Sequence, residues 1–420
     1  MVPFPTLSDY LQLEHDVARI LTEQELFGWA FNESSAQQLA QTLYGELQGI
    51  TSVLRDRYPY VAGSEFYPKR PNKSYGYYEG CPSTRLKDFS PTSRDHIAWV
   101  MQTHHGWKPT LTTESGKPTI DEVVLKEIGT EEALQFFRCL ELTKQLGMLS
   151  EGKNAWLKLV RNGRIHHNCV VATNTHRCSH RNPNLAQVPS EPEFRSLFMA
   201  TPGKVMVGAD LAGIELRMLA HYLARYDGGR YGEVLLHGDI HQENADKIGI
   251  SRKLVKTVTY AFLYGAGDQK IGLSFDQSLP PNKAKQEGKE IRQAYMDAIP
   301  GLEKLVTDVK KASERGYIKS IDGRQIKVDS SHKALNYLLQ SGAGVVAKRW
   351  MVIADHANLC EHTHQLAFIH DEVQWETLPA SADMWRQYLE LMAIEAGEYY
   401  NLRIQIAATG KVGNTWADVH

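Results

Sequence analysis

The chain has 420 residues, of which 42% are hydrophobic, and a formal net charge of −2. This length is too great for one compact core and predicts about two to four subdomains. The near-neutral charge excludes a broadly basic coating but is compatible with a local basic groove. The sequence has no run of roughly 18 apolar residues and no signal-peptide pattern, so we expect no membrane association. The few cysteines are scattered and odd in number, which favours reduced thiols in a cytoplasmic protein.

The N-terminal part of the sequence is mainly helical in pattern. Two amphipathic helices are expected within residues 8–57, and helical periodicity returns at 92–105 and 120–148. Between them, residues 58–91 are rich in Tyr, Pro, Gly and Lys/Arg and lack regular periodicity. We therefore expect a surface loop or a small extension there. Residues 165–200 are polar and loop-like.

The strand patterns of the sequence begin at residue 204. The apolar run "KVMVGAD" predicts a buried strand, and the helical pattern "GIELRMLAHYLARY" follows it. Residues 232–320 are mostly helical in pattern. Two β-hairpins are expected, one in "YIKSIDGRQIKV" and one in "QLAFIHDEVQWE", with the long helix "KALNYLLQSGAGVVAKRWMVIADHA" between them.

Carboxylates stand at the ends of two predicted strands. Asp210 closes "KVMVGAD", and Asp371 and Glu372 lie at the tip of the second hairpin. A buried strand holds its last residue rigidly, so two such aspartates on neighbouring strands would hold two Mg²⁺ ions roughly 4 Å apart. Mg²⁺ needs only a few carboxylate oxygens besides water and phosphate. The alternative is that these acids are ordinary solvated turn residues.

The segment "SRKLVKTVTYAFLYG" predicts a helix with Ser251 as its N-cap and Gly265 as its left-handed end. A polar stripe repeats along it at every fourth position: Arg252, Lys256, Tyr260 and Tyr264. Two cations in the first turns oppose the helix dipole, unless a bound triphosphate reverses the balance. The aromatic side chains would then stack on the base and sugar. The stripe is therefore interpreted as a nucleotide-binding surface, and a solvated helix face is the alternative.

Two further segments carry weaker signals. The histidines and cysteines of "HHNCVVATNTHRCSH" do not follow a standard zinc-ligand spacing. Its polar composition and Arg177 favour a loop that contacts phosphate. In "GDIHQEN", Asp239 and His241 indicate no function by themselves.

Three segments in this order resemble the polymerase motifs of the family A DNA polymerases, relatives of bacterial DNA polymerase I. They are "DLAGIELR", "RKLVKTVTYAFLYG" and "HDE". The lead-in "THRCSHRNPNLAQVPS" is similar to the family's loop before the first motif. "GDIHQEN", "DGRQIKV", "ALNYLLQSGAG" and "NTWADVH" resemble the branch of T-odd bacteriophage replicative polymerases. The resemblance runs from roughly residue 10 to the last residue.

The resemblance implies an α+β, right-hand polymerase fold, with a helical thumb and fingers and a small antiparallel sheet in the palm. The expected thumb is residues 1–165, with 58–91 as its extension. The palm would combine 166–221 with 336–420, and the fingers would be 222–335.

The resemblance also implies roles for individual residues around the metals and the nucleotide. Asp210 and Asp371 would ligate the metals, together with the Leu211 carbonyl and with Glu372 as support. Lys256 would be a catalytic residue and would grip the triphosphate. The other residues that it implies at the nucleotide are Arg252, His241, Tyr260, Tyr264 and Glu215.

Among these residues, Tyr260 would stack beside the sugar and base, and Tyr264 would lie at the template side of the new base pair. Glu215 would pair with Tyr260 and crowd a 2′-hydroxyl. The residues expected to contact DNA are Arg177, Arg324, Asn336, Gln340 and His370.

The implied activity is that of a template-directed DNA polymerase, a nucleotidyltransferase that adds deoxynucleotides to a primer 3′ end. We expect two Mg²⁺ ions as cofactors, replaceable by Mn²⁺, and primer-template DNA and dNTPs as partners. The expected setting is phage-type DNA replication in the cytoplasm of an infected bacterium. Because the chain opens directly on thumb-like helices, we expect no 3′→5′ exonuclease within it. A processivity factor or a separate exonuclease protein would be a further partner.

Two other functions are alternatives to that of a DNA polymerase. A single-subunit RNA polymerase shares two palm aspartates and a Lys/Tyr helix, but Glu215 opposite Tyr260 and the form "HDE" argue against it. An inactive nucleic-acid-binding accessory protein is disfavoured because Asp210, Asp371 and Lys256 are all present.

Overall fold

The computed structural model describes residues 8–109, 111–113, 115–171, 173–276 and 279–420. Contacts within the chain divide it into two compact units. The smaller unit is Ser34–Lys158, and the larger unit joins Met1–Glu33 to Leu159–His420. Each unit has a hydrophobic core of its own.

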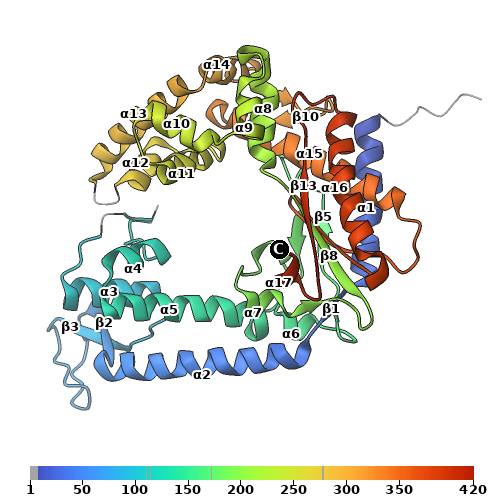
Figure 1. Ribbon diagram of the computed structural model, residues 1–420. Coiled ribbons are helices and arrows are strands. Elements are labelled where there is room, and N and C mark those ends of the chain that lie inside the picture. Colours follow the sequence, from blue (N-terminus) through green and yellow to red (C-terminus); the bar gives the residue numbers. More distant parts are fainter. Residues whose placement is uncertain (1–7, 110, 114, 172, 277–278) are drawn as a thin grey trace, which may run out of the picture. The chain divides into compact units, whose positions relative to one another are not determined.

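Helices form most of the smaller unit, which has the blue-to-teal colours in Figure 1. They are α2 (Glu33–Arg57), α3 (Arg94–His105), α4 (Glu122–Ile128), α5 (Glu131–Leu146), the π-helix Gly147–Glu151 and α6 (Trp156–Leu159). Ser93, Asp121 and Thr130 cap three of these helices, because each side chain accepts a main-chain N–H of the first turn. The apolar helix faces meet in a core that contains Leu54 and Phe136.

The expectation of a loop or small extension at 58–91 is incomplete. This segment contains an antiparallel ribbon of β2 (Tyr60–Phe66) and β3 (Ser83–Asp88). Most of its side chains are exposed on both faces, so the strands lack the alternation that reveals a half-buried strand in a sequence. The ribbon is therefore a surface feature of the smaller unit.

A four-stranded antiparallel sheet lies at the centre of the larger unit. Its strand order is β11 (His364–Ile369), β12 (Glu372–Thr377), β8 (Val205–Leu211) and β13 (Ala408–Gly413). The second predicted hairpin is therefore confirmed as β11 and β12, and "KVMVGAD" is confirmed as part of β8. The helix α16 (Ala382–Tyr399) packs against β8 and β13, and α1 (Asp9–Phe27) packs against β11.

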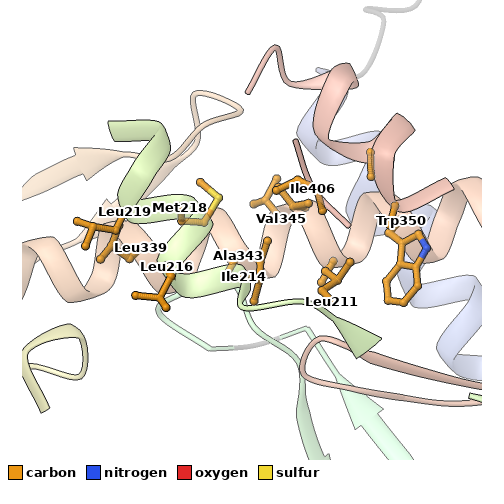
Figure 2. Close-up of a cluster of buried hydrophobic side chains, with 14 of the residues drawn as sticks. Leu211, Ile214, Leu216, Met218, Leu219, Leu339, Ala343, Val345, Trp350 and Ile406 are labelled. Carbon is orange, nitrogen blue, oxygen red and sulfur yellow. The ribbon is translucent and has the colours of Figure 1, made fainter. Parts of the chain in front are cut away.

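The core of this unit is built around α15 (Ala334–Ala357), the long helix expected from the sequence. Figure 2 shows Leu339 and Val345 of α15 among side chains of β8, of α8 (Ile214–Asp227) and Ile406. Small residues let α8 approach α15 closely: a Cβ added at Gly342 would lie 2.5 Å from Cε of Met218. This packing fixes the start of α8 directly after the end of β8.

Further helices follow α8 and cluster together in Figure 1. They are α9 (Arg230–His237), α10 (Ile240–Ile248), α11 (Arg252–Leu263), α12 (Asp268–Phe275), α13 (Pro281–Ala298) and α14 (Leu302–Ser313). The helices α12 and α13 touch through glycines, since a Cβ at Gly272 would lie 1.8 Å from the main-chain oxygen of Ala284. The hairpin of β9 (Tyr317–Lys319) and β10 (Gln325–Lys327) confirms the first predicted hairpin, and Gly323 at its turn has φ +84°.

Short elements complete the larger unit. They are the strands β1 (Trp29–Phe31), β4 (Arg164–Ile165), β5 (Asn168–Val170), β6 (Ser179–Arg181) and β7 (Phe198–Met199), the helices α7 (Pro192–Arg195) and α17 (Trp416–Val419), and the 3₁₀ turns Leu185–Gln187, Ser331–Lys333 and Pro379–Ser381. Helices and small antiparallel sheets together give the α+β class expected from the sequence. No helix in the described part of the chain has the length and apolar character that a membrane span requires.

The compact smaller unit, Ser34–Lys158, covers fewer residues than the thumb expected at 1–165. The helix α1 belongs to the larger unit, where Arg19 pairs with Asp355 of α15 at 2.5 Å. Its apolar face adds Leu13 and Val17 to the core around α15. Amphipathic periodicity alone does not identify which core a helix joins.

Candidate active site

The two aspartates predicted to act together lie where the two inner strands of the central sheet, β8 and β12, meet at one end of the sheet. We call this end the sheet edge. β8 and β12 pair antiparallel, with Asp210 opposite Glu372, and Asp371 lies in the turn just before β12. The main-chain N–H of Leu211 donates to the carbonyl of Asp371 at 3.0 Å. Two residues far apart in the sequence are thus held side by side by one strand pairing.

Unbalanced negative charge distinguishes this sheet edge. Burial and the nearby charges of Asp371 and Glu372 raise the pKa of Asp210 to about 7. Burial and the charge of Glu215 raise the pKa of Asp371 to about 6, although Arg177 opposes this shift. Among the described residues, neither aspartate has an ion pair. Carboxylates in this state are suited to a divalent cation, which would relieve their repulsion.

The neighbouring carboxylate of Glu372 is already satisfied. It is buried and accepts hydrogen bonds from Nε1 of Trp416 at 2.7 Å, from Nδ1 of His420 at 3.0 Å and from Gln374. This agrees with a supporting residue rather than a direct ligand. The side chain of Leu211 is buried in the core, so only its main-chain carbonyl is a potential ligand.

The helix α11 carries the predicted polar stripe. Ser251 caps the helix by accepting the N–H of Leu254, and Gly265 follows its end with φ +70°, as predicted. Arg252, Lys256 and Tyr264 of the stripe are exposed, and Tyr260 is half-buried. The rings of Tyr260 and Tyr264 stack with centroids 6.4 Å apart.

Electrostatic interactions link α11 to the sheet edge. The pKa of Tyr260 is raised by burial and by the charges of Glu215 and Asp371. The same three causes, with Arg177 opposing, raise the pKa of Tyr264 to about 12. The aromatic end of the stripe therefore lies within electrostatic range of the carboxylates.

Glu215 pairs with a different tyrosine from the one expected. Its Oε1 accepts from the hydroxyl of Tyr264 at 3.2 Å and from a guanidinium nitrogen of Arg177 at 2.7 Å. The predicted pairing of Glu215 with Tyr260 is therefore wrong in this structure. Tyr260 and Tyr264 lie on the same face of α11, one turn apart, so helix periodicity alone does not indicate which of them reaches Glu215.

The cationic end of the stripe contains one paired and one unpaired side chain. The guanidinium of Arg252 donates to Asp239 at 2.7 Å, and Asp239 also caps α10. Within the described part of the chain, Lys256 has no ion pair. His241 is buried with its ring centroid 6.4 Å from that of Tyr260, and burial and the charge of Arg252 lower its pKa. The structure thus places His241 beside the stripe, which its motif alone did not indicate.

Arg324, which is expected to contact template phosphate, pairs with carboxylates in this structure. Arg324 is 7% exposed, and its guanidinium pairs with Asp322 at 2.6 Å and with Glu14. Glu14 also accepts from the buried ammonium group of Lys348 at 2.7 Å. These ion pairs join the hairpin turn to α1, so Arg324 has a structural role in this structure.

The other expected DNA contacts are divided between free and occupied side chains. Asn336 is buried and donates its amide N–H to the carbonyl of Leu263, so it supports the end of α11 in this structure. Gln340 lies one turn further along α15, is half-buried and has no side-chain hydrogen bond among the described residues. His370 lies in the hairpin turn with φ +61°, and its side chain is exposed.

The described residues of the histidine- and cysteine-rich loop make other contacts in this structure. In the described ranges, no group of three or more His, Cys, Asp or Glu side chains is arranged to hold a metal. His166 and His167 instead bond to the main-chain carbonyls of Glu25 and Leu366. At the sheet edge, too, the described residues include no group of three such side chains, and only Asp210 and Asp371 are available as carboxylate ligands. This is sufficient for Mg²⁺, which keeps water and substrate oxygens as ligands.

Comparisons with known proteins agree with this geometry. The family model of "DNA polymerase family A" matches residues 81–418. The DNA-directed DNA polymerases of Enterobacteria phage T3 and Escherichia phage T7 are each 30% identical over 98% of this chain and 70% of their own length. The solved structure "POL domain of Pol1 from M. smegmatis complex with DNA primer-template and dNTP" matches with a TM-score of 0.78 and 20% identity, over 97% of this chain and 70% of that chain.

The likeness to the mycobacterial domain concerns the fold, because identity there is low. The family match spans both the sheet edge and α11, and the phage relatives match nearly every residue of the chain. The chain belongs to DNA polymerase family A.

Proposed function

We propose that this chain extends a DNA primer at its 3′ end, with Asp210 and Asp371 holding two divalent cations and α11 binding the incoming deoxynucleotide. As a member of family A, the chain is a template-directed DNA polymerase. The observation that carries the residue assignment is the pair of unmatched carboxylates on adjacent strand ends, within electrostatic range of the tyrosines of α11.

Polymerases of this family generally depend on divalent metal ions. At this sheet edge Asp210, Asp371 and the Leu211 carbonyl would hold them, and Mg²⁺ suits this oxygen donor set. Bound there, the ions would neutralise charge on the transferred phosphate and acidify the primer hydroxyl. Glu372, held by Trp416 and His420, would keep the end of β12 in place.

The cations of α11 would bind the triphosphate. Lys256 is exposed and unpaired, so a phosphate can reach it without displacing another group. Arg252 would exchange Asp239 for phosphate, and an exposed ion pair contributes only about 0–1 kcal/mol. The phosphate would also lie at the helix N-terminus, which favours an anion. Lys256 is further proposed as the proton donor to the leaving pyrophosphate.

Sugar selection is assigned to Glu215. Its carboxylate is held by Arg177 and Tyr264 and its charge reaches Asp371, so it is fixed beside the proposed catalytic site. A fixed carboxylate there would crowd a 2′-hydroxyl and favour deoxynucleotides. We propose primer-template DNA and dNTPs as substrates, in keeping with the complex named for the mycobacterial domain, and phage DNA replication as the setting.

The test is primer extension with Mg²⁺ by the wild-type chain and by Asp371→Asn. The variant keeps the shape of the side chain but removes its charge, so extension should fall by roughly 10³-fold or more, since metals supply several kcal/mol to the transition state. Affinity for primer-template DNA should change little, because phosphate contacts dominate it.

A matched control is Asp246→Asn, which removes an exposed carboxylate of α10. This variant should extend primers normally. Equal losses in the two variants, or an equal loss of DNA affinity and of rate in Asp371→Asn, would contradict the assignment. Efficient use of ribonucleotides by the wild-type chain would contradict the role of Glu215.

A further inference from the structure

A cavity open to solvent lies in the larger unit, and neither Asp210 nor Asp371 lines it. It has a volume of about 290 Å³ and is lined by α8, α14, β9, α15 and the segment after α16. Tyr222 at its wall is seven residues beyond Glu215 on α8, which corresponds to roughly 10 Å along the helix. Small-molecule pockets have volumes of roughly 300–1,000 Å³, so this cavity is close to the smallest pockets that hold one small ligand.

Positive charge is concentrated at this cavity without balancing carboxylates. Four cationic side chains line it: Arg225, Arg315, Lys319 and Arg403. All four are exposed, and none has an ion pair among the described residues. Asp308 is the one carboxylate among the described lining residues, and it already accepts from the hydroxyl of Tyr226 at 2.8 Å.

Other arginines of the same unit are arranged differently. Arg230 pairs with Glu243 at 3.0 Å, and Arg292 pairs with Asp268 at 2.6 Å. The chain therefore has carboxylates available for surface arginines in a sequence whose net charge is −2. Four unpaired cations around one cavity repel each other, and an anion in the cavity would relieve this repulsion.

The uncharged side chains that line the cavity indicate what the ligand carries besides its anionic group. Apolar side chains and the rings of Tyr222 and Tyr226 form much of the wall, so a bare phosphate would leave that surface in contact with water. The hydroxyl of Tyr222 is buried and has no hydrogen-bond partner among the described residues, which is costly unless a ligand atom or a water reaches it. A ligand with an oxyanion at one end and a flat polar ring at the other matches this lining.

His221 adds a hydrogen-bond donor. Its Nδ1 accepts the main-chain N–H of Arg403 at 3.1 Å, and burial and the charges of Arg403 and Arg225 lower its pKa to about 4. The imidazole is therefore neutral near pH 7, with its proton on Nε2. A neutral histidine donates to phosphate without adding to the repulsion among the four cations.

We propose that this cavity is a second nucleotide-binding site, in which the four cations bind the phosphate and the tyrosine-lined wall receives the base. The nucleotide can be free or can be one unit of the single-stranded template. The site does not depend on the roles assigned to Asp210, Asp371 and α11, and its test does not use catalysis.

The test compares the double variant Arg225→Ala/Arg403→Ala with the wild-type chain in two binding arms, both with metal chelated. The first arm measures binding of dAMP by equilibrium titration. The second measures the affinity for primer-templates with a short or a long 5′ template overhang by fluorescence anisotropy. The charge-matched control is Lys285→Ala/Lys289→Ala, which removes two exposed cations of α13.

A free nucleotide as ligand predicts a loss of roughly tenfold or more in dAMP affinity in the cavity variant, because charged hydrogen bonds to phosphate are lost. A template nucleotide as ligand predicts instead that only the long overhang loses affinity. The slope of log affinity against log salt should then become shallower by about 1.4, for two phosphate contacts to a single strand.

Thermal unfolding of the variants should match that of the wild-type chain, since the substituted arginines are exposed and unpaired. Either pattern of loss supports a nucleotide site in the cavity. If the cavity variant loses no more than the control in both arms, the proposal is wrong.

Discussion

Charged side chains are arranged in opposite ways at two places in the larger unit. In the first, which we call the matched cluster, Glu14 and Asp322 enclose the buried cations of Arg324 and Lys348. Every charge there has a partner of opposite sign. Such a cluster holds α1, the β9–β10 hairpin and α15 together and leaves no charge for a ligand.

The second place is the candidate active site, where charges of the chain lack partners. Among the described residues, Asp210 and Asp371 have no ion pair, and burial and neighbouring carboxylates raise their pKa values. Lys256 on α11 likewise has no ion pair with a described carboxylate. Perturbed and unmatched groups in a concave site are typical of function, whereas matched buried groups are typical of structure. The comparison therefore predicts which substitutions impair catalysis and which impair folding.

The largest expected effect is on catalysis, in Lys256→Ala. Removing this unmatched cation should reduce the extension rate by roughly 10²–10³-fold, the usual cost of losing one group that stabilises transition-state charge. The free energy of unfolding should stay nearly unchanged, because Lys256 is exposed. Single-turnover extension and urea unfolding measure the two quantities.

The matched control is Lys253→Ala, on the same helix and also exposed but outside the stripe. It should extend primers at nearly the wild-type rate. If both lysine variants lose activity equally, α11 contributes only general positive charge, and the specific role of Lys256 is wrong.

A large effect on stability is expected in the matched cluster. Glu14→Gln removes the carboxylate between Arg324 and Lys348 and leaves the buried Lys348 without its partner. We expect the free energy of unfolding to fall by about 3 kcal/mol, the usual cost of breaking a buried ion pair from one side. Urea unfolding measures this change.

Lys348→Met is the informative companion to that variant. Replacing the buried ammonium by an apolar side chain of similar length leaves Glu14 paired with Arg324, so the loss should be smaller. A larger loss in Lys348→Met than in Glu14→Gln would show that the cluster acts through packing rather than through charge.

The same comparison explains what the sequence could and could not predict. The sheet edge was predictable because an apolar strand ending in Asp210 and a hairpin with Asp371 at its tip are local patterns. The matched cluster was not, because Arg324 meets Glu14 across more than 300 residues of sequence, and no local pattern reveals burial of that kind. The motif predicts that Arg324 contacts phosphate, whereas the structure shows its guanidinium paired with Glu14 and Asp322.

Helix periodicity predicted the stripe of α11 but not its partners. The helical wheel places Tyr260 and Tyr264 on one face, one turn apart, and which of them lies level with Glu215 depends on the tertiary packing of α11. Periodicity therefore does not predict which tyrosine bonds to Glu215. The β2–β3 ribbon was missed for a different physical reason, namely that exposure of both faces removes the alternation of a strand.

A smaller effect is expected from pH. The pKa values of Asp210 and Asp371 rise from an ordinary value near 3.8 to about 7 and about 6 in the folded, metal-free protein. Between about pH 4 and pH 7 the folded state therefore retains protons that the unfolded state releases, and the free energy of unfolding falls as pH rises. Because both carboxylates are partly exposed, we expect a fall on the order of 1 kcal/mol.

Urea unfolding with a chelator at the two ends of that range measures the fall, and Asp210→Asn should flatten it. Added Mg²⁺ should raise the stability near pH 7 and have little effect near pH 4, because protonated carboxylates bind metal poorly. Stabilisation by Mg²⁺ of equal size at both pH values would place the ion elsewhere.

The smallest expected effect tests which tyrosine Glu215 binds. Tyr264→Phe removes the hydroxyl that donates to Glu215 at 3.2 Å, while Arg177 still pairs with the carboxylate. Since Tyr264 is 51% exposed, the free energy of unfolding should fall by less than about 1 kcal/mol. Tyr260→Phe is the control on the same helix and should change stability less, because its hydroxyl has no partner within the described residues. A larger loss in Tyr260→Phe would mean that Glu215 pairs with Tyr260 in solution, which would require α11 to be shifted by about one helical turn along its axis relative to α8.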